Sequence, residues 1–549
     1  MWSTIVSYIP DWETFMQAAI TLVCPIGIYF IYNALYSAIG SGRAAKAGKA
    51  PAHPPTTDKA EPASPKLSGN YDADLMSIKQ AIGGNSDVHF REFTVKTHKL
   101  RAVLIFVEGL QDEAMINKQV LQVLMLDNQL ENEAMTLSLL KESMLPLTEI
   151  NEINEMNSLQ ELILFGNTAL IVEGMSTALL VGSRDGSKRA ITEPTSEALL
   201  RGPRIAFSET LSENTSMLRR QGLSTNLEMK MYEVGSRMKR NLVIAYIKDI
   251  VNQELLQEVK DRIAKIDMDF LAESGYVEQL IEDNYLSPFQ QTQNTERPDR
   301  VINSLLEGRV AILLDGTPFA LIVPVTFSML LQSPEDYYER WLPGTMLRLL
   351  RFFAAFLALL APALYISFIS FHPGLIPTEL AITIMETRQG VPFPSVIEVM
   401  ILEVSIEILR EAGIRLPKPI GPAMGIVGGL IIGDAAVNAG IVSPFLVIVV
   451  AVTAISSFSI PMYSAGITLR ILRFVGMLFA SVLGMFGTIL FFLLIIVHLT
   501  KLKSFGVPYV TPFSPMRFSD WKDLYIRAPI PVMKQRPEML KPQKKKRRS

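Results

Sequence analysis

The sequence contains a single cysteine, Cys24, among its 549 residues. One cysteine cannot form a disulfide bond or a Cys-based metal site within one chain. No two histidines have the spacing of paired metal ligands; the five are His53, His89, His98, His372 and His498. The chain also lacks G-x-x-x-x-G-K-[ST] and, after a predicted strand, G-x-G-x-x-G, the patterns that bind phosphates. We therefore predict no metal site, no cofactor and no enzymatic activity.

The formal net charge is only −2, so charge indicates no nucleic-acid partner. Apolar residues make up 49% of the chain and the mean hydropathy is +0.26, which is high for a wholly soluble protein. Most of the excess lies before residue 42 and after residue 345. This distribution predicts an α+β membrane protein, in which a cytoplasmic region of two α/β subdomains is followed by a helical transmembrane domain.

The N-terminal segment 1–42 is predicted to be an additional transmembrane helix. Residues 15–39 carry no charge, and about twenty apolar residues span a bilayer. Basic residues follow at Arg43, Lys46 and Lys49, which places residue 43 onward in the cytoplasm. Residues 43–70 are rich in Ala, Pro, Lys and Ser, so we predict a disordered linker there.

Strand and helix patterns alternate through residues 71–200 and again through 201–340, which predicts one α/β subdomain in each range. Residues 100–110 have the composition of a buried strand, and residues 253–267 have the spacing of an amphipathic helix. Residues 308–325 predict two strands that turn at Asp315-Gly316.

Residues 341–503 are predicted to form the helical membrane domain. Clean apolar spans cover 352–371, 420–439, 442–461 and 474–499. Four crossings return the chain to its starting side. The favoured topology therefore places both ends of this membrane domain in the cytoplasm, with a partly inserted or re-entrant acidic run at 397–413. If that run crosses, one end lies outside.

Residues 504–549 end in KPQKKKRRS, which predicts a basic cytoplasmic tail attracted to anionic lipid headgroups.

Four glycines recur every fourth residue within one predicted span: Gly421, Gly425, Gly429 and Gly433. On a helix they form a smooth ridge that another backbone can approach closely. The pattern predicts tight helix packing, either within the chain or between subunits.

The acidic run is the most unusual feature of the membrane half. Glu403, Glu407 and Glu411 share one helix face, and Glu398 lies about a turn and a half earlier. Such a face cannot turn to hydrocarbon, so it meets interfacial water, basic partners such as Arg410, or an aqueous pore. Interfacial helices favour Lys and Arg on their polar face, whereas the polar face of this helix is mainly acidic. Carboxylates repeated around an axis would form rings that attract cations.

Several long motifs resemble the GerA family of A subunits of spore-germination nutrient receptors. In the membrane half they are PGTMLRLLRFFAAFLALLAPALYISFISFHPGLIPTEL, GVPFPSVIEVMILEVSIEILREAGIRLPKPIG and SFGVPYVTPFSP. In the soluble half they are SDVHFREF, EPTSEALLRGPRIAFSETLSENTSMLRR and SPEDYYERW. The likeness extends over about residues 68 to 527.

This resemblance implies a subunit of a nutrient-gated cation channel in the spore inner membrane, with its large domain in the cytoplasm. The implied partners are a transporter-like B subunit, a lipoprotein C subunit, further copies of the chain in a pentameric ring, membrane lipids and monovalent cations. Together with the carboxylate spacing, it predicts that Glu403 and Glu407 face the conduction path and that Glu398 and Glu411 lie near its mouths. Val399 and Met400 are predicted to form an apolar constriction that gates by dewetting.

Charged residues of the polar bridge, Glu197, Arg201 and Arg204, are candidates for inter-subunit or gating ion pairs, or for solvated loop charges. Two other functions stay open. A secondary transporter would couple ions to a solute, although the chain shows no repeated halves in its membrane segments. A scaffold would use the membrane part only as an anchor.

Overall fold

The structure is a computed structural model that describes residues 65–96, 99–126, 136–147, 149–182, 193–222, 224–415, 433–517 and 519–547. The predicted N-terminal helix and most of the predicted linker lie outside the described residues. The folded region begins slightly before residue 71, because Leu67 is buried in the first core and the backbone amides of Ser68 and Gly69 donate hydrogen bonds to Asp74.

The first subdomain is an antiparallel five-stranded sheet with helices on both faces. Its strand order is β1-β2-β4-β5-β3. The strands are β1 (Val88–Val95), β2 (Leu100–Val107), β3 (Ile150–Ile153), β4 (Thr168–Val172) and β5 (Ala178–Val181). Alternate residues of β2 face opposite cores, since Val103 packs with one helical layer and Leu104 with the other.

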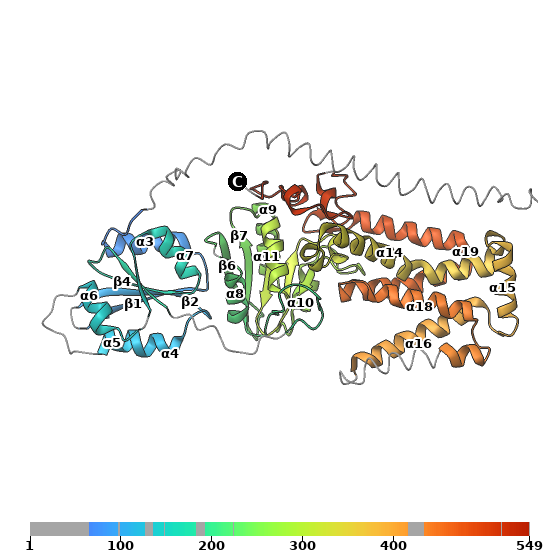
Figure 1. Ribbon diagram of the computed structural model, residues 1–549, viewed down its shortest axis with the longest axis horizontal. Helices are drawn as coiled ribbons and strands as arrows, with labels where there is room; N and C mark the ends of the chain where they lie inside the picture. Colours follow the sequence, from blue (N-terminus) through green and yellow to red (C-terminus); the bar gives the residue numbers. More distant parts are fainter. Residues whose placement is uncertain are drawn as a thin grey trace, which may run out of the picture. The chain divides into compact units, whose positions relative to one another are not determined.

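Two helical layers cover this sheet. One contains α3 (Tyr71–Ile82) and α7 (Met156–Leu164). The other contains α4 (Glu113–Met115), η1 (Ile116–Leu121), α5 (Gln122–Leu126), α6 (Leu137–Leu139) and η2 (Leu140–Met144). Figure 1 shows the two layers on opposite sides of the strands.

The second subdomain repeats the topology of the first. Its strand order is β6-β7-β9-β10-β8. The strands are β6 (Leu227–Val234), β7 (Arg240–Ile247), β8 (Gln293–Thr295), β9 (Val310–Leu314) and β10 (Ala320–Val323). One face is covered by α8 (Leu211–Arg220) and α11 (Pro298–Glu307), and the other by α9 (Gln253–Ala264) and α10 (Ser274–Ile281). The mixed α/β architecture predicted for the soluble region is therefore confirmed. The shared strand order of the two subdomains was not predicted from the sequence.

A buried ion pair joins the two subdomains. Arg219 on α8 donates two hydrogen bonds of 2.8 Å to Asp87, which precedes β1. The same guanidinium donates to the side-chain oxygen of Asn85 and to the backbone carbonyl of Leu227. The bidentate geometry fixes the junction between the subdomains.

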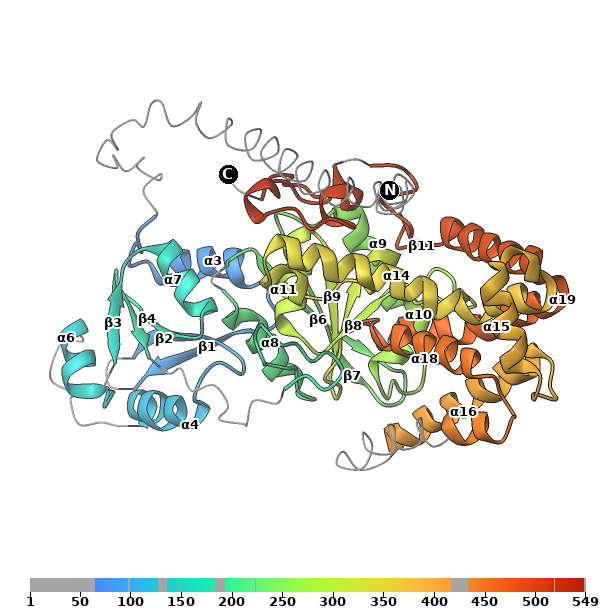
Figure 2. The ribbon, with the colours of Figure 1, turned by 45° about the vertical axis from the view of Figure 1, so that its right-hand side comes forward.

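The helical domain follows α12 (Phe327–Leu330) and α13 (Glu335–Tyr338). Its helices are α14 (Trp341–Ile366), η3 (Ser367–Phe371), η4 (Pro373–Leu375), α15 (Thr378–Arg388), α16 (Ser395–Arg415), α18 (Pro444–Phe458) and α19 (Tyr463–Lys501). α14, α18 and α19 lie side by side in two views (Figures 1 and 2). Among the described residues, Trp341–Phe371 and Tyr463–Lys501 are long and apolar enough, by length and composition, to cross a membrane, but the second segment is interrupted at Gly484.

The predicted single span at 474–499 is wrong as a continuous helix, because the chain turns back within α19. Gly484 has φ +59° and ψ −136°, which are not helical values. A Cβ placed on Gly476 would lie 2.7 Å from the ring of Phe491, so the segments before and after Gly484 pack against each other. Glycine adopts this backbone conformation without the steric cost of a side chain.

The predicted span 420–439 lies mostly outside the described residues, as do Gly421, Gly425 and Gly429. Gly433 is described and lies in the helical stretch 433–438. A Cβ placed there would lie 3.5 Å from Val447 of α18, so this glycine packs against a helix of its own chain.

The described part of the basic tail, up to residue 547, folds onto the second subdomain. Its elements are β11 (Lys503–Ser504), β12 (Val507–Pro508), η5 (Asp520–Asp523), η6 (Ile530–Val532) and η7 (Glu538–Leu540). Gln543 donates a 2.9 Å backbone hydrogen bond to Ile250, and Lys544 lies 2.6 Å from Asp249. At least part of the tail's positive charge is therefore paired within the chain.

Candidate functional site

The acidic residues of α16 meet arginines from other parts of the helical domain. Glu398 and Glu403 are buried, Glu407 is about one-third exposed, and Glu411 is exposed. Three of these four carboxylates contact an arginine outside α16. The site therefore combines residues that are far apart in the sequence.

Glu398 lies at the end of the bundle that contains the α15–α16 connection. Its Oε1 accepts a 2.7 Å hydrogen bond from Arg388, at the end of α15. Its Oε2 accepts a 3.1 Å hydrogen bond from the backbone amide of Ser443, the N-cap of α18. A carboxylate near a helix N-terminus is stabilised by the helix dipole. Glu398 therefore ties α15, α16 and α18 together.

Among the ion pairs made by α16, the one between Glu403 and Arg473 is the most deeply buried. Arg473 Nη2 lies 2.7 Å from Glu403 Oε2, and both side chains are 1% exposed. Arg473 belongs to α19, so this pair joins α16 to the first half of the α19 hairpin. A buried charge of this kind is tolerated only when it is paired.

Glu407 lies between two arginines. Arg470 Nη1 is 3.3 Å from one carboxylate oxygen, and Arg410 Nη1 is 3.8 Å from the other. Arg410 also donates a 3.0 Å hydrogen bond to Ser457 Oγ, and its guanidinium lies over the ring of Phe458. Both of these partners are at the C-terminal end of α18.

Glu411 is the fourth carboxylate, and its pair is local. It accepts hydrogen bonds from Arg415 one turn later, and both side chains are exposed. An exposed pair of this type contributes little to stability.

The exposed face of α16 is apolar. It carries Ile397, Ile401, Val404 and Ile408, while Val399 is buried and Met400 is half-buried. In the single chain the carboxylates of Glu398 and Glu403 therefore face neighbouring helices of the same chain. Their assignment to a conduction path, and that of Val399 and Met400 to a constriction, stay predictions about an assembly.

The sequence analysis named Arg410 as a possible partner of these carboxylates but missed Arg388, Arg470 and Arg473. A signal was present, since Arg470 and Arg473 are one turn apart on a helix, as are Glu403 and Glu407. Matching these two pairs across a bundle requires the hairpin geometry of α19.

A second network connects the soluble region to the helical domain. Glu197 Oε1 lies 3.1 Å from Arg300 Nη1, and each of the two side chains is 8% exposed. The same guanidinium lies 3.7 Å from the sulfur of Met462, which is the N-cap of α19. Glu197 is thus paired inside its own chain at the junction with the helical domain.

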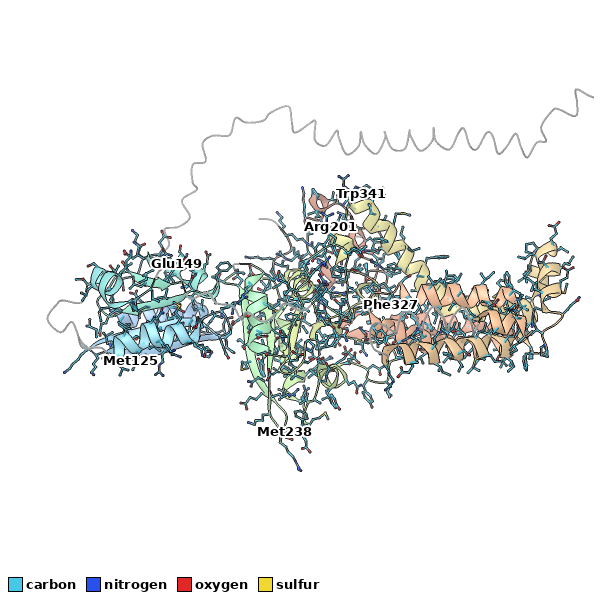
Figure 3. The ribbon with its side chains drawn as sticks, turned by 60° about the horizontal axis from the view of Figure 1, so that its bottom comes forward. Met125, Glu149, Arg201, Met238, Phe327 and Trp341 are labelled. Carbon is cyan, nitrogen blue, oxygen red and sulfur yellow. The ribbon has the colours of Figure 1, made fainter. Side chains whose placement is uncertain are left out.

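The two arginines grouped with Glu197 are exposed. Arg204 contacts Glu193 at 3.3 Å. Arg201 lies 3.8 Å from Glu339, two residues before Trp341, at which α14 begins (Figure 3). Their inter-subunit or gating role stays a prediction.

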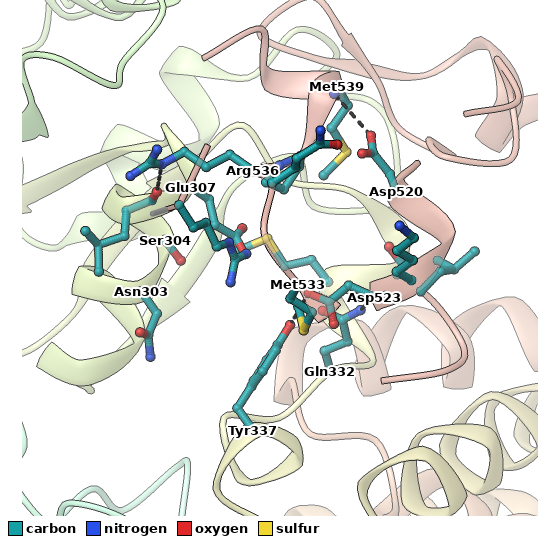
Figure 4. Close-up of a pocket in the computed structure, with 18 of the residues that line it drawn as sticks. Asn303, Ser304, Glu307, Gln332, Tyr337, Asp520, Asp523, Met533, Arg536 and Met539 are labelled. Carbon is teal, nitrogen blue, oxygen red and sulfur yellow. Dashed lines mark hydrogen bonds and ion pairs between the residues drawn. The ribbon is translucent and has the colours of Figure 1, made fainter. Parts of the chain in front are cut away.

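A cavity of about 810 Å³ lies between α11, α13 and the tail. Figure 4 shows Glu307, Tyr337, Asp523 and Arg536 around it. Burial raises the pKa of Glu307, and Arg309 and Arg547 partly offset that effect. Tyr337 donates a 2.8 Å hydrogen bond to Asp523, which also accepts one from Arg348 of α14. The tail therefore forms one wall of the cavity.

Among the described residues, no group of three His, Cys, Asp or Glu side chains is placed to hold a metal ion. The fold and the charged site define a class of protein: a duplicated α/β soluble region joined to an apolar helical domain whose buried charges are paired within the bundle.

The comparisons with known proteins identify the family. The model described as "Bacillus/Clostridium GerA spore germination protein" matches residues 76–539. Spore germination protein GerLA of Bacillus cereus is 43% identical over 475 residues, covering 86% of this chain and 96% of the relative. Spore germination protein KA of Bacillus subtilis (strain 168) is 40% identical over 485 residues, covering 88% of each. The chain therefore belongs to the GerA family, which confirms the resemblance in its motifs.

One solved structure is similar to the soluble part. It is the crystal structure of the N-terminal domain of the A subunit of the Bacillus megaterium spore germinant receptor GerK3. The match has 34% sequence identity and a TM-score of 0.39, and covers 48% of this chain and 98% of that chain.

Proposed function

We propose that this chain is the A subunit of a germinant receptor in the spore inner membrane. In this proposal it spans the membrane several times and keeps its soluble region in the cytoplasm. It acts with a transporter-like B subunit and a lipoprotein C subunit, and copies of it form a pentameric ring. Nutrient binding elsewhere in the receptor opens the ring to monovalent cations.

The observation that carries the proposal is the row of carboxylates on α16, a helix packed into an apolar bundle. Ionisable groups are costly at membrane depth, and those that occur there often mark ion pathways. Four carboxylates on one helix, repeated around an axis, would concentrate cations and repel anions. Membership of the GerA family supports a role in germination.

We propose that the paired carboxylates correspond to a closed state. Arg473 neutralises Glu403, and Arg470 and Arg410 surround Glu407. Opening would separate α16 from α19 and turn Glu403 and Glu407 towards an aqueous path. Glu411 is already exposed, and in the ring it would lie at a mouth of that path.

Potassium flux through the reconstituted receptor complex tests this role. We expect Glu407→Gln, and more strongly the double change Glu403→Gln with Glu407→Gln, to lower K⁺ flux and to weaken the preference for K⁺ over Cl⁻. Glu379→Gln is the matched control, because Glu379 is an exposed carboxylate of the same domain on α15. Size-exclusion profiles establish that each variant is folded. Unchanged flux and selectivity in folded variants would exclude the pore assignment.

A secondary transporter is the second candidate, favoured by the interruption of α19 at Gly484. Transporters use discontinuous helices beside buried charges to bind substrates and ions. The mass of the purified protein in detergent separates the two functions: a ring supports the channel, and a monomer that binds a nutrient directly supports the transporter.

A further inference from the structure

The helical domain contains an excess of buried positive charge near its junction with the soluble region. The guanidiniums of Arg410, Arg470 and Arg473 meet only two carboxylates, those of Glu403 and Glu407. No other carboxylate among the described residues lies within ion-pair distance of these arginines. One positive charge in this cluster, which we call the arginine cluster, is therefore not balanced.

The arginine cluster also has more unpartnered donors than acceptors. Within the described part of the chain, Nε of all three arginines and Nη1 of Arg473 are buried without a hydrogen-bond partner. Two acceptors, Glu403 Oε1 and Glu407 Oε2, are in the same condition. Buried donors without partners are costly, and a bound group with several acceptor oxygens would satisfy them. Because the arginine cluster has one excess positive charge, the bound group should be an anion.

The surroundings of the arginine cluster indicate where such an anion would come from. Thr468 on α19 donates a 2.6 Å hydrogen bond to Pro288 of the second subdomain, so Arg470 and Arg473 lie within about two helical turns of the soluble region. In the topology proposed above, on which this step rests, this position corresponds to the level of the lipid headgroups.

Exposed apolar side chains lie beside the arginine cluster. Glu407 is partly exposed, and near it Ile408 and Phe458 are 65% and 70% exposed. Tyr463 is half exposed, and the guanidinium of Arg470 lies over its ring. Tyrosine with an apolar body and a polar tip is typical of the membrane interface. Basic pockets between helices at this depth bind phosphate-bearing lipid headgroups.

We propose that the arginine cluster binds the phosphate group of an anionic membrane lipid. The planar guanidinium groups suit phosphate, because each can present two parallel N–H donors to it. The lipid chains would lie against the apolar rim formed by α16 and α18. This inference stands whether or not the chain conducts ions, since it rests on the charge balance of one chain.

Arg410 is the best position for a test. Removing its charge leaves the Glu403–Arg473 and Glu407–Arg470 pairs intact and brings the cluster to neutrality. Arg410→Gln removes the charge, and Arg410→Lys retains it. Arg415→Gln is the matched control, because Arg415 is an exposed arginine on the same helix that pairs with Glu411, which is also exposed.

The experiment measures binding of short-chain phosphatidylglycerol, phosphatidylcholine and inorganic phosphate to the full-length chain in detergent, by native mass spectrometry. We expect phosphatidylglycerol to bind, Arg410→Gln to weaken it about tenfold or more, and Arg410→Lys and Arg415→Gln to bind as the unmodified chain does. Thermal unfolding establishes that each variant is folded.

Each outcome decides the proposal. Preference for phosphatidylglycerol that depends on Arg410 supports a lipid source. Binding of inorganic phosphate with the same dependence supports the phosphate site but gives it a soluble source. Equal binding to the unmodified chain and Arg410→Gln, or no binding of either anion, would overturn it. The proposal would also be overturned if a carboxylate from a second copy of the chain fills the cluster. This would appear as dimers of the unmodified chain that are lost in Arg410→Gln.

Discussion

Glu403 and Arg473, seventy residues apart in the sequence, lie 2.7 Å apart and are each 1% exposed. A carboxylate predicted to face an ion path is thus paired with an arginine of its own chain. This pair fixes α16 against α19, the helix that begins at the junction with the soluble region. Any movement that opens a path along α16 must break or transfer this pair.

The pair predicts a difference between single and double substitutions. Arg473→Gln leaves the Glu403 carboxylate buried without its partner, and we expect it to lower the free energy of unfolding by about 3–5 kcal/mol. Glu403→Gln combined with Arg473→Gln removes both charges and should recover most of that loss. Thermal unfolding in detergent measures both. A double variant as unstable as the single one would show that Glu403 and Arg473 are not energetically coupled.

The contact between Glu197 and Arg300 predicts a second effect, at the junction of the two regions. Glu197→Ala leaves the buried guanidinium of Arg300, beside Met462, without its carboxylate partner. We therefore expect the free energy of unfolding to fall by about 3 kcal/mol. Spores that carry this variant should respond more weakly to nutrient at equal protein levels.

Arg237→Ala is the control for this prediction, because Arg237 is 80% exposed and its partner Asp269 is exposed as well. It should change stability by less than about 0.5 kcal/mol. Equal effects of the two substitutions on stability and on the nutrient response would contradict a coupling role for Glu197.

Two carboxyl groups of the second subdomain predict a pH dependence. Burial raises the pKa of Glu278 to about 7. Burial likewise raises the pKa of Glu282 to about 7. An unfolded glutamate titrates near pH ~4.3. Between that pH and 7 the folded chain binds more protons than the unfolded chain, so the contribution of these groups to stability falls as the pH rises.

Replacing both residues with glutamine removes this dependence. Between pH 5 and pH 7.5, the free energy of unfolding of the unmodified protein should fall by on the order of 1–3 kcal/mol relative to that of the Glu278→Gln, Glu282→Gln variant. Thermal unfolding at a series of pH values gives the comparison, and taking the difference cancels the titration of all other groups. Parallel pH profiles for the two proteins would refute the shifted pKa values.

Local patterns were sufficient to predict parts of the soluble fold. The turn at Asp315-Gly316 was predictable because aspartate followed by glycine suits a tight turn, and Gly316 has φ +84°. The strand now seen as Leu100–Val107 and the helix Gln253–Ala264 were predictable from apolar composition and spacing. The shared topology of the two sheets could not be recognised, because it lies in strand order rather than in repeated residues.

The helical domain was harder to predict, because apolar composition does not show where a helix breaks. Gly484 is one of many glycines in the apolar helical domain, and nothing local distinguishes the one at which α19 reverses. Once that reversal is missed, Arg470 and Arg473 have no evident relation to α16. The acidic face was therefore predicted correctly as a feature, while its arginine partners depended on tertiary structure.

Single-particle imaging of the purified receptor complex in lipid nanodiscs decides whether α16 has the proposed role. We expect several copies of this chain around one axis, with α16 the helix nearest to that axis. In an open state, Glu403 and Glu407 should be separated from Arg473 and Arg470 and should face the lumen. A monomeric chain, or a ring with α16 on its outer, lipid-facing side, would contradict cation conduction along this helix.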